Sequence, residues 1–136
     1  MNPLILTPVH GEPCYSLAIE RFCDLFARVT GKRAVLGETD DGVSDLVLIG
    51  NDTVNDHLAS ELFADRTKPL GIRYGTDDYL IRIEKREGRH IVLLSGGRAR
   101  STLYAIYDFF ERFADCHYFW DGDVIPQCDD ILLAEV

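Results

Sequence analysis

The sequence lacks the features that mark membrane-spanning and exported proteins. No run approaches the ~20 consecutive apolar residues that a membrane-spanning helix needs, so no membrane span is predicted. Residues 1–9 have neither a basic first part nor an apolar stretch long enough for a signal peptide. If a longer parent protein is exported, its signal lies outside this sequence, and the compartment stays unknown.

Basic residues are also scarce. Lys and Arg number 14 against 23 Asp and Glu, which gives a formal net charge of −9. The closest basic grouping is Lys85, Arg86 and Arg89 in one predicted turn. Nucleic-acid binding needs a concentrated basic surface, so a nucleic-acid partner is not expected.

The motifs of common metal and catalytic sites are missing as well. There is no CxxC among the four cysteines, no H-E-x-x-H, no G-x-S-x-G and no P-loop lysine. The four histidines, His10, His57, His90 and His117, lack the spacing of metal ligands. We therefore predict no catalytic, cofactor-binding or metal-binding residue, and no cofactor.

Three local patterns could suggest a ligand, and each has a more ordinary structural interpretation. The acidic turn at residues 37–42 lacks the D-x-D-x-D-G order of a calcium loop, which favours a solvated turn. Asp121-Gly122-Asp123 is a lone D-x-D and is more typical of an Asp-Gly turn. The glycines of Ser95-Gly96-Gly97 favour a close strand-to-helix turn over phosphate binding.

The sequence does contain predicted strands that alternate with predicted helices, which indicates one α/β domain over residues 1–136. Apolar or alternating runs predict strands, and residues 90–95 (HIVLLS) read as a strand buried on both faces near the sheet centre. A hairpin turn with Gly88 joins this strand to the one before it. The predicted strands are residues 4–7, 32–36, 45–50, 78–84 and 90–95, with 131–136 either a final strand or the start of a linker.

Two long helices are predicted from apolar residues at helical spacing. Residues 14–29 place one apolar stripe opposite a polar face, and Gly31 ends that helix. The second helix begins near Arg98. A weaker helix follows Asn51 or Asp52, and a loop occupies residues 65–75. The stripe of the first long helix is Tyr15, Ala18, Phe22, Leu25, Phe26 and Val29. The stripe of the second is Leu103, Ile106, Tyr107, Phe110, Phe113 and Ala114, with Ser101, Ala105, Asp108 and Arg112 opposite.

The fold class that follows is α/β (α+β), a mixed β-sheet with two main helices packed on it. The chain has 136 residues. A catalytic (β/α)₈ barrel needs at least ~200 residues, so this sequence does not contain one.

The second helix and its flanks resemble a known accessory domain. Residues 100–111 (RSTLYAIYDFFE) resemble the "RGxLYGxYxFLE" helix of the small α/β domain that precedes the catalytic barrel in several glycoside hydrolases, such as α-glucuronidases and β-N-acetylhexosaminidases. Residues 115–119 (DCHYF) resemble its "GCRWF", and residues 123–126 (DVIP) its "xxVP" exit. Residues 29–32 (VTGK) and 46–50 (LVLIG) are similar to its "TGK" and "IxLG". Ser101 and Asp115 stand where the family often has Gly, and Tyr118 where it often has Trp.

The resemblance implies a non-catalytic N-terminal domain whose helices pack together on one side of the sheet. Its partner would be the adjacent catalytic barrel of the same polypeptide, which acts on a polysaccharide or glycan. The alternative is a small carbohydrate-binding or protein-interaction module that acts on its own.

The aromatic segment 118–120 is the candidate contact surface. Core packing at the domain edge is favoured over an exposed platform. Of the two functional interpretations, a domain contact is preferred over a sugar contact, because the resembled segment leads into the barrel. The candidate interdomain or sugar contacts are Tyr118, Trp120 and Asp121. Trp120→Ala is expected to leave the isolated domain folded and to weaken its docking.

Overall fold

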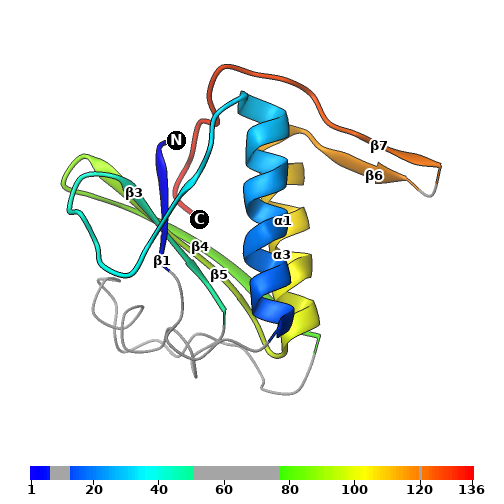
Figure 1. The fold of residues 1–136 in the computed structure, drawn as a ribbon, viewed down its shortest axis with the longest axis horizontal. Coiled ribbons are helices and arrows are strands. Elements are labelled where there is room, and N and C mark those ends of the chain that lie inside the picture. The colour runs from blue at the N-terminus through cyan, green and yellow to red at the C-terminus, as the bar shows by residue number, and fades with distance from the viewer. Residues whose placement is uncertain (7–12, 51–76, 120) are drawn as a thin grey trace.

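A computed structural model describes residues 1–6, 13–50, 77–119 and 121–136 of the chain. These residues form two sheets and two helices, α1 and α3 (Figure 1). The predicted helix after Asn51 or Asp52, the predicted loop 65–75 and Trp120 lie outside the described residues. The elements are β1 (Pro3–Leu6), α1 (Pro13–Thr30), β2 (Val35–Gly37), β3 (Asp45–Ile49), β4 (Tyr79–Arg86), β5 (Arg89–Gly96), α3 (Ala99–Ala114), β6 (His117–Phe119) and β7 (Gly122–Val124).

The main sheet has five strands in the order β2-β1-β3-β5-β4. The first four of these run parallel, and β4 is antiparallel to β5 through the hairpin turn at Gly88. This mixed sheet with two helices confirms the predicted α/β (α+β) class. The prediction for residues 90–95 is confirmed too, because β5 has a strand on each side and residues 91–94 are at most 1% exposed.

Both helices pack side by side on one face of the main sheet (Figure 1). The core between them is aromatic: the ring of Phe22 lies 5.1 Å from that of Phe110 and 5.7 Å from that of Phe109, measured between centroids. The opposite face of the sheet holds a second buried apolar cluster. That cluster consists of Leu4, Leu6, Leu46, Leu48, Ile91 and Leu93.

The predicted stripe of α1 is confirmed where the structure describes it. Its last five members, from Ala18 to Val29, are at most 2% exposed. The opposite face is exposed at Ser16, Glu20 and Asp24. The side chain of Tyr15 lies outside the described residues. α1 therefore packs as an amphipathic helix whose apolar side faces the sheet and α3.

The predicted face of α3 is partly wrong. Ser101 and Ala105 were placed on the solvent side, yet both are 0% exposed, and Phe109, absent from the predicted stripe, is also 0% exposed. The physical reason is that α3 contacts β5, β4 and α1 together, so its buried arc is wider than a single sheet-facing stripe. The small side chains of Ser101 and Ala105 fit where backbone comes close.

Residues 131–136 form no strand, but they lie against the sheet. Ile131 is buried in the helix-covered core. Val136 exchanges two backbone hydrogen bonds with Ile83 of β4, with N···O distances of 3.2 and 3.4 Å. This single pair occupies part of the outer edge of β4.

The acidic turn between β2 and β3 is held by its own carboxylates. Asp41 accepts hydrogen bonds from the backbone of Val43 and from both the backbone and the hydroxyl of Ser44, which lowers the pKa of Asp41 to about 2. Asp40 accepts two bonds from the guanidinium of Arg89, at 2.6 and 2.7 Å. The turn is therefore fixed to the start of β5 by a bidentate ion pair.

Replacing Asp40 with asparagine should lower the free energy of unfolding at neutral pH by about 1 kcal/mol, the scale of a well-aligned but partly exposed ion pair. The hydrogen bond from Arg89 holds the pKa of the Asp40 carboxyl below its usual value. A depressed folded pKa stabilises the fold above the unfolded pKa of about 3.9 and no longer does so below the folded pKa.

The difference between wild type and Asp40→Asn should thus be constant above about pH 5 and should shrink as the pH falls below 4. Urea unfolding across this range measures it. Asp129→Asn changes an exposed carboxylate and serves as the control. A difference that persists unchanged at pH 2 would contradict the ion-pair assignment.

Candidate functional site

The candidate site is the small hairpin formed by β6 and β7. α3 ends at Ala114 and is capped by Asp115, whose left-handed backbone (φ 55°) lets Cys116 donate its N–H to the carbonyl of Phe110 at 3.2 Å. Asp tolerates this conformation better than most residues, which explains how it replaces the glycine of the resembled motif. The chain then turns away into β6, and the hairpin extends from the body beyond the end of α3 (Figure 1).

The hairpin is short and exposed on its second strand. Its pairs are His117 with Val124, Tyr118 with Asp123, and Phe119 with Gly122. All three residues of β7 are exposed, and Val124 is 50% exposed. An apolar side chain that is half exposed on an outlying strand leaves a face that could accept another surface.

The structure separates the three predicted contact residues. Tyr118 is half-buried, and its ring meets Tyr107 edge-on with the centroids 4.8 Å apart. Its hydroxyl donates to the carbonyl of Tyr107 at 3.3 Å, and burial raises the pKa of the Tyr118 phenol. Tyr118 thus packs at the base of the hairpin, Asp121 is exposed at its turn, and Trp120 lies outside the described residues.

Beside Tyr118 there is a small hollow of about 210 Å³ lined by Tyr107, Tyr118 and Asp123. Two aromatic rings beside a carboxylate can accept a group with an apolar body and a donor at its tip, such as a sugar hydroxyl or a basic side chain. Tyr107 and Asp123 were not predicted as contact residues. The sequence pattern placed Tyr107 in the core stripe of α3 and Asp123 in a turn, so only the pairing of β6 with β7 brings them together.

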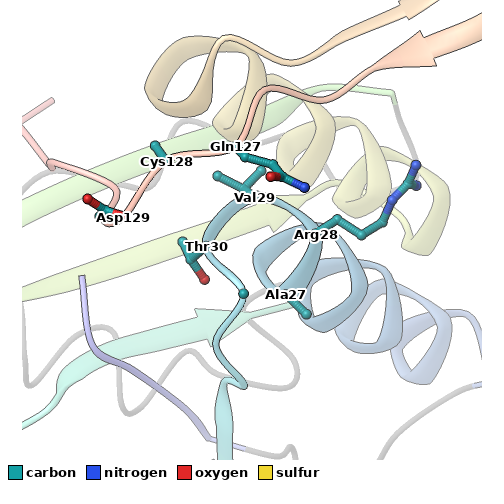
Figure 2. A pocket seen from close by; sticks show the side chains of 8 residues that line it. Ala27, Arg28, Val29, Thr30, Gln127, Cys128 and Asp129 are labelled. Carbon is teal, nitrogen blue, oxygen red and sulfur yellow. The ribbon is translucent and has the colours of Figure 1, made fainter.

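A second hollow, of about 370 Å³, lies at the C-terminal end of α1. Figure 2 shows Gln127, Cys128 and Asp129 crossing that end of the helix. Arg28 and Asp129 extend to opposite sides (Figure 2), so their charges do not converge on one ligand. The backbone N–H of Cys128 donates to the carbonyl of Val29 at 2.8 Å. This hydrogen bond attaches the C-terminal segment to α1. It supports a structural role, rather than ligand binding, for the residues that line the hollow.

The glycines between β5 and α3 allow a close strand-to-helix turn, which is the interpretation that the sequence favoured over phosphate binding. The two arginines at the start of α3, Arg98 and Arg100, both contact the carboxylate of Asp77, at 3.0 and 2.8 Å. Gly96 lies against the backbone of Ser101 and Thr102. The carboxylate of Asp77 thus already pairs with both arginines at the start of α3.

Histidines and cysteines are dispersed among the described residues. His90 lies 3.5 Å from Asp45, and His117 lies 3.1 Å from Asp115. His10 and His57 lie outside the described residues. Within the described ranges no group of three His, Cys, Asp or Glu side chains could hold a metal ion. In the same ranges no helix has the length and apolar character to cross a bilayer. The free thiols there are Cys23, Cys116 and Cys128.

No known family model matches the chain, and no curated protein matches it either. The resemblance to the accessory domain of glycoside hydrolases therefore rests on the residues of α3 and its flanks.

Proposed function

We propose that the chain is a non-catalytic N-terminal accessory domain of a glycoside hydrolase, which packs against the catalytic barrel and supports its position. Three features favour this role. The helix at residues 100–111 resembles the accessory-domain helix, both helices pack on one side of a mixed sheet, and the chain leaves α3 through an outlying hairpin.

The observation that carries the proposal is the exposed β6–β7 hairpin. An isolated two-stranded hairpin is marginally stable in water, and each strand here has only three residues. Packing against a second surface would stabilise such a hairpin. The neighbouring domain of the same polypeptide suits this position, because the hairpin is the part of the described chain that stands farthest out from the body (Figure 1).

The first test of this role is the mass of the native protein, detected in its own cells with an antibody against this chain. The accessory role predicts a mass several times the 15.4 kDa of the present chain. The catalytic residues would then lie after Val136. A native mass of 15.4 kDa would rule out the role as stated.

Val124→Asp should separate docking from folding. The side chain of Val124 is 50% exposed, so the isolated domain should lose less than about 0.5 kcal/mol of unfolding free energy. In the longer native protein the same change should loosen the hairpin contact and speed proteolysis between the domains. Leu132→Asp is the control, because Leu132 is 80% exposed away from the hairpin. Equal protease sensitivity in both variants would count against hairpin docking.

A second candidate function is carbohydrate binding by the hollow at Tyr107, Tyr118 and Asp123. The two aromatic rings beside a carboxylate favour it. A titration with oligosaccharides, followed by NMR, tests it: saturable shifts confined to these residues and lost in Asp123→Ala would favour binding over docking.

A further inference from the structure

One face of the β6–β7 hairpin carries a carboxylate beside two aromatic rings. Tyr118 and Asp123 lie directly opposite each other in the hairpin register, so both side chains are on the same face of it. Tyr107 of α3 completes the hollow. Burial is the main cause of the raised pKa of the Tyr118 phenol, and the negative charge of Asp123 adds to the rise. The carboxylate of Asp123 therefore lies close enough to act together with the rings.

The carboxylate of Asp123 takes part in no ion pair or hydrogen bond within the described part of the chain. Residues 113–136 contain six Asp and Glu but no Lys or Arg. The nearest arginine along the sequence, Arg112, pairs with Asp108 at 3.0 Å. The chain as a whole carries a formal net charge of −9. A cation that pairs with Asp123 is therefore expected to come from another surface.

The size and chemistry of the hollow suit one guanidinium group. Its volume is about 210 Å³, below the roughly 300–1,000 Å³ of a typical small-molecule pocket, so it has room for a single side chain. A guanidinium is flat, so it can stack on an aromatic ring while its N–H groups donate to a carboxylate. A lysine ammonium lacks both the flat face and the paired donors. The hydroxyl of Tyr118 already donates to the carbonyl of Tyr107, so Asp123 supplies the charged acceptor.

We propose that the hollow formed by Tyr107, Tyr118 and Asp123 binds an arginine side chain of the adjacent catalytic domain. Its guanidinium stacks on a tyrosine ring and donates two hydrogen bonds to the Asp123 carboxylate. Val124 follows Asp123 on β7 and points to the opposite face, so contacts at both residues hold the hairpin from two sides. This inference rests on the proposed accessory role, because that role supplies the second domain.

The chemistry of the hollow is tested on the present chain by NMR titration with N-acetyl-arginine amide. We expect saturable shifts confined to the residues of the hollow, with a dissociation constant on the order of 10 mM or weaker, the scale of one exposed charge pair with a cation–π contact. N-acetyl-citrulline amide has nearly the same shape without the charge and should bind about fivefold more weakly. Asp123→Asn should weaken binding of the arginine probe by a similar factor. Asp121→Asn removes the same charge from the exposed turn and should leave that binding unchanged.

Equal binding of the two probes, or equal effects of the two variants, would overturn the arginine site. So would saturable binding of an oligosaccharide at the hollow without binding of the arginine probe, which would favour the second candidate function.

The same two variants separate this inference from the accessory role. In the longer native protein Asp123→Asn should speed proteolysis between the domains about fivefold, whereas Asp121→Asn should not. Circular dichroism verifies that both exposed substitutions leave the fold intact. A native mass of 15.4 kDa would overturn the accessory role and the arginine contact together. A larger native mass with equal protease sensitivity in the two variants would overturn the arginine contact alone.

Discussion

Gly96→Ala is expected to lower the free energy of unfolding by about 3 kcal/mol, at the upper end of the usual cost of overpacking. A Cβ at this position would lie 2.3 Å from the backbone nitrogen of Thr102 and 2.5 Å from both the carbonyl carbon and the hydroxyl of Ser101. Two of these three atoms are backbone and cannot rotate away. The first turn of α3 would have to move off the end of β5.

That first turn has little freedom to move. The hydroxyl of Ser101 accepts the N–H of Arg98 at 3.0 Å and lies 2.9 Å from its carbonyl oxygen. Thr102 donates its N–H to the same carbonyl at 3.2 Å. These bonds lie within the turn, so it cannot deform locally around an added methyl group without breaking them, and both Ser101 and Thr102 are 0% exposed. The cost should therefore come from packing rather than from the local conformation of residue 96.

Gly42→Ala is the matched control, measured by the same urea unfolding experiment. Gly42 has a φ of +73° and nothing within 4 Å of an added Cβ, so its cost is conformational, about 1 kcal/mol. Losses of equal size in the two variants would mean that the close approach at Gly96 is not the source of the cost. A loss confined largely to Gly96→Ala would show that the glycine break positions α3 on the sheet.

The strands of the main sheet and the first helix could be predicted from the sequence because local pattern and long-range packing agree there. The apolar run of β5 is buried on both faces, and the alternation of β4 puts Ile81 and Ile83 inside. In α1 the apolar stripe is the buried face. Each of these residues meets the environment that its hydrophobicity indicates.

The face of α3 and the hairpin could not be predicted in the same way. Ser101 is buried because Gly96 lets the strand approach, and that contact spans two elements, which helical periodicity does not describe. The strands β6 and β7 have three residues each, too few for alternation to indicate a strand. The turn at Asp121-Gly122 was predicted, whereas the meeting of Tyr107, Tyr118 and Asp123 depends on the hairpin register.

The second large loss of stability is expected for Phe109→Ala, because Phe109 is buried on the side of α3 that helical periodicity does not indicate. Phe109 is 0% exposed, and its ring centroid lies 5.7 Å from that of Phe22 and 5.2 Å from that of Phe110. Phe109 therefore contacts α1 through Phe22 as well as its neighbour Phe110 on α3. Removing a fully buried phenyl ring from such a core costs about 3–5 kcal/mol. For a domain with a total stability of about 5–15 kcal/mol, this loss removes a large share of the stability of the folded state.

Phe113→Ala makes the same chemical change one turn later on α3. Phe113 belongs to the stripe predicted from periodicity, but its side chain is only partly buried, so the loss should be about 1–2 kcal/mol. Chemical denaturation of the two variants thus compares a residue on the buried face of α3 with a residue on the face that helical periodicity predicts. If Phe113→Ala proved the more damaging, α3 would have to be rotated toward the stripe that its sequence predicts. The expected order instead makes Phe109, together with Phe110, part of the aromatic contact between α3 and Phe22 of α1.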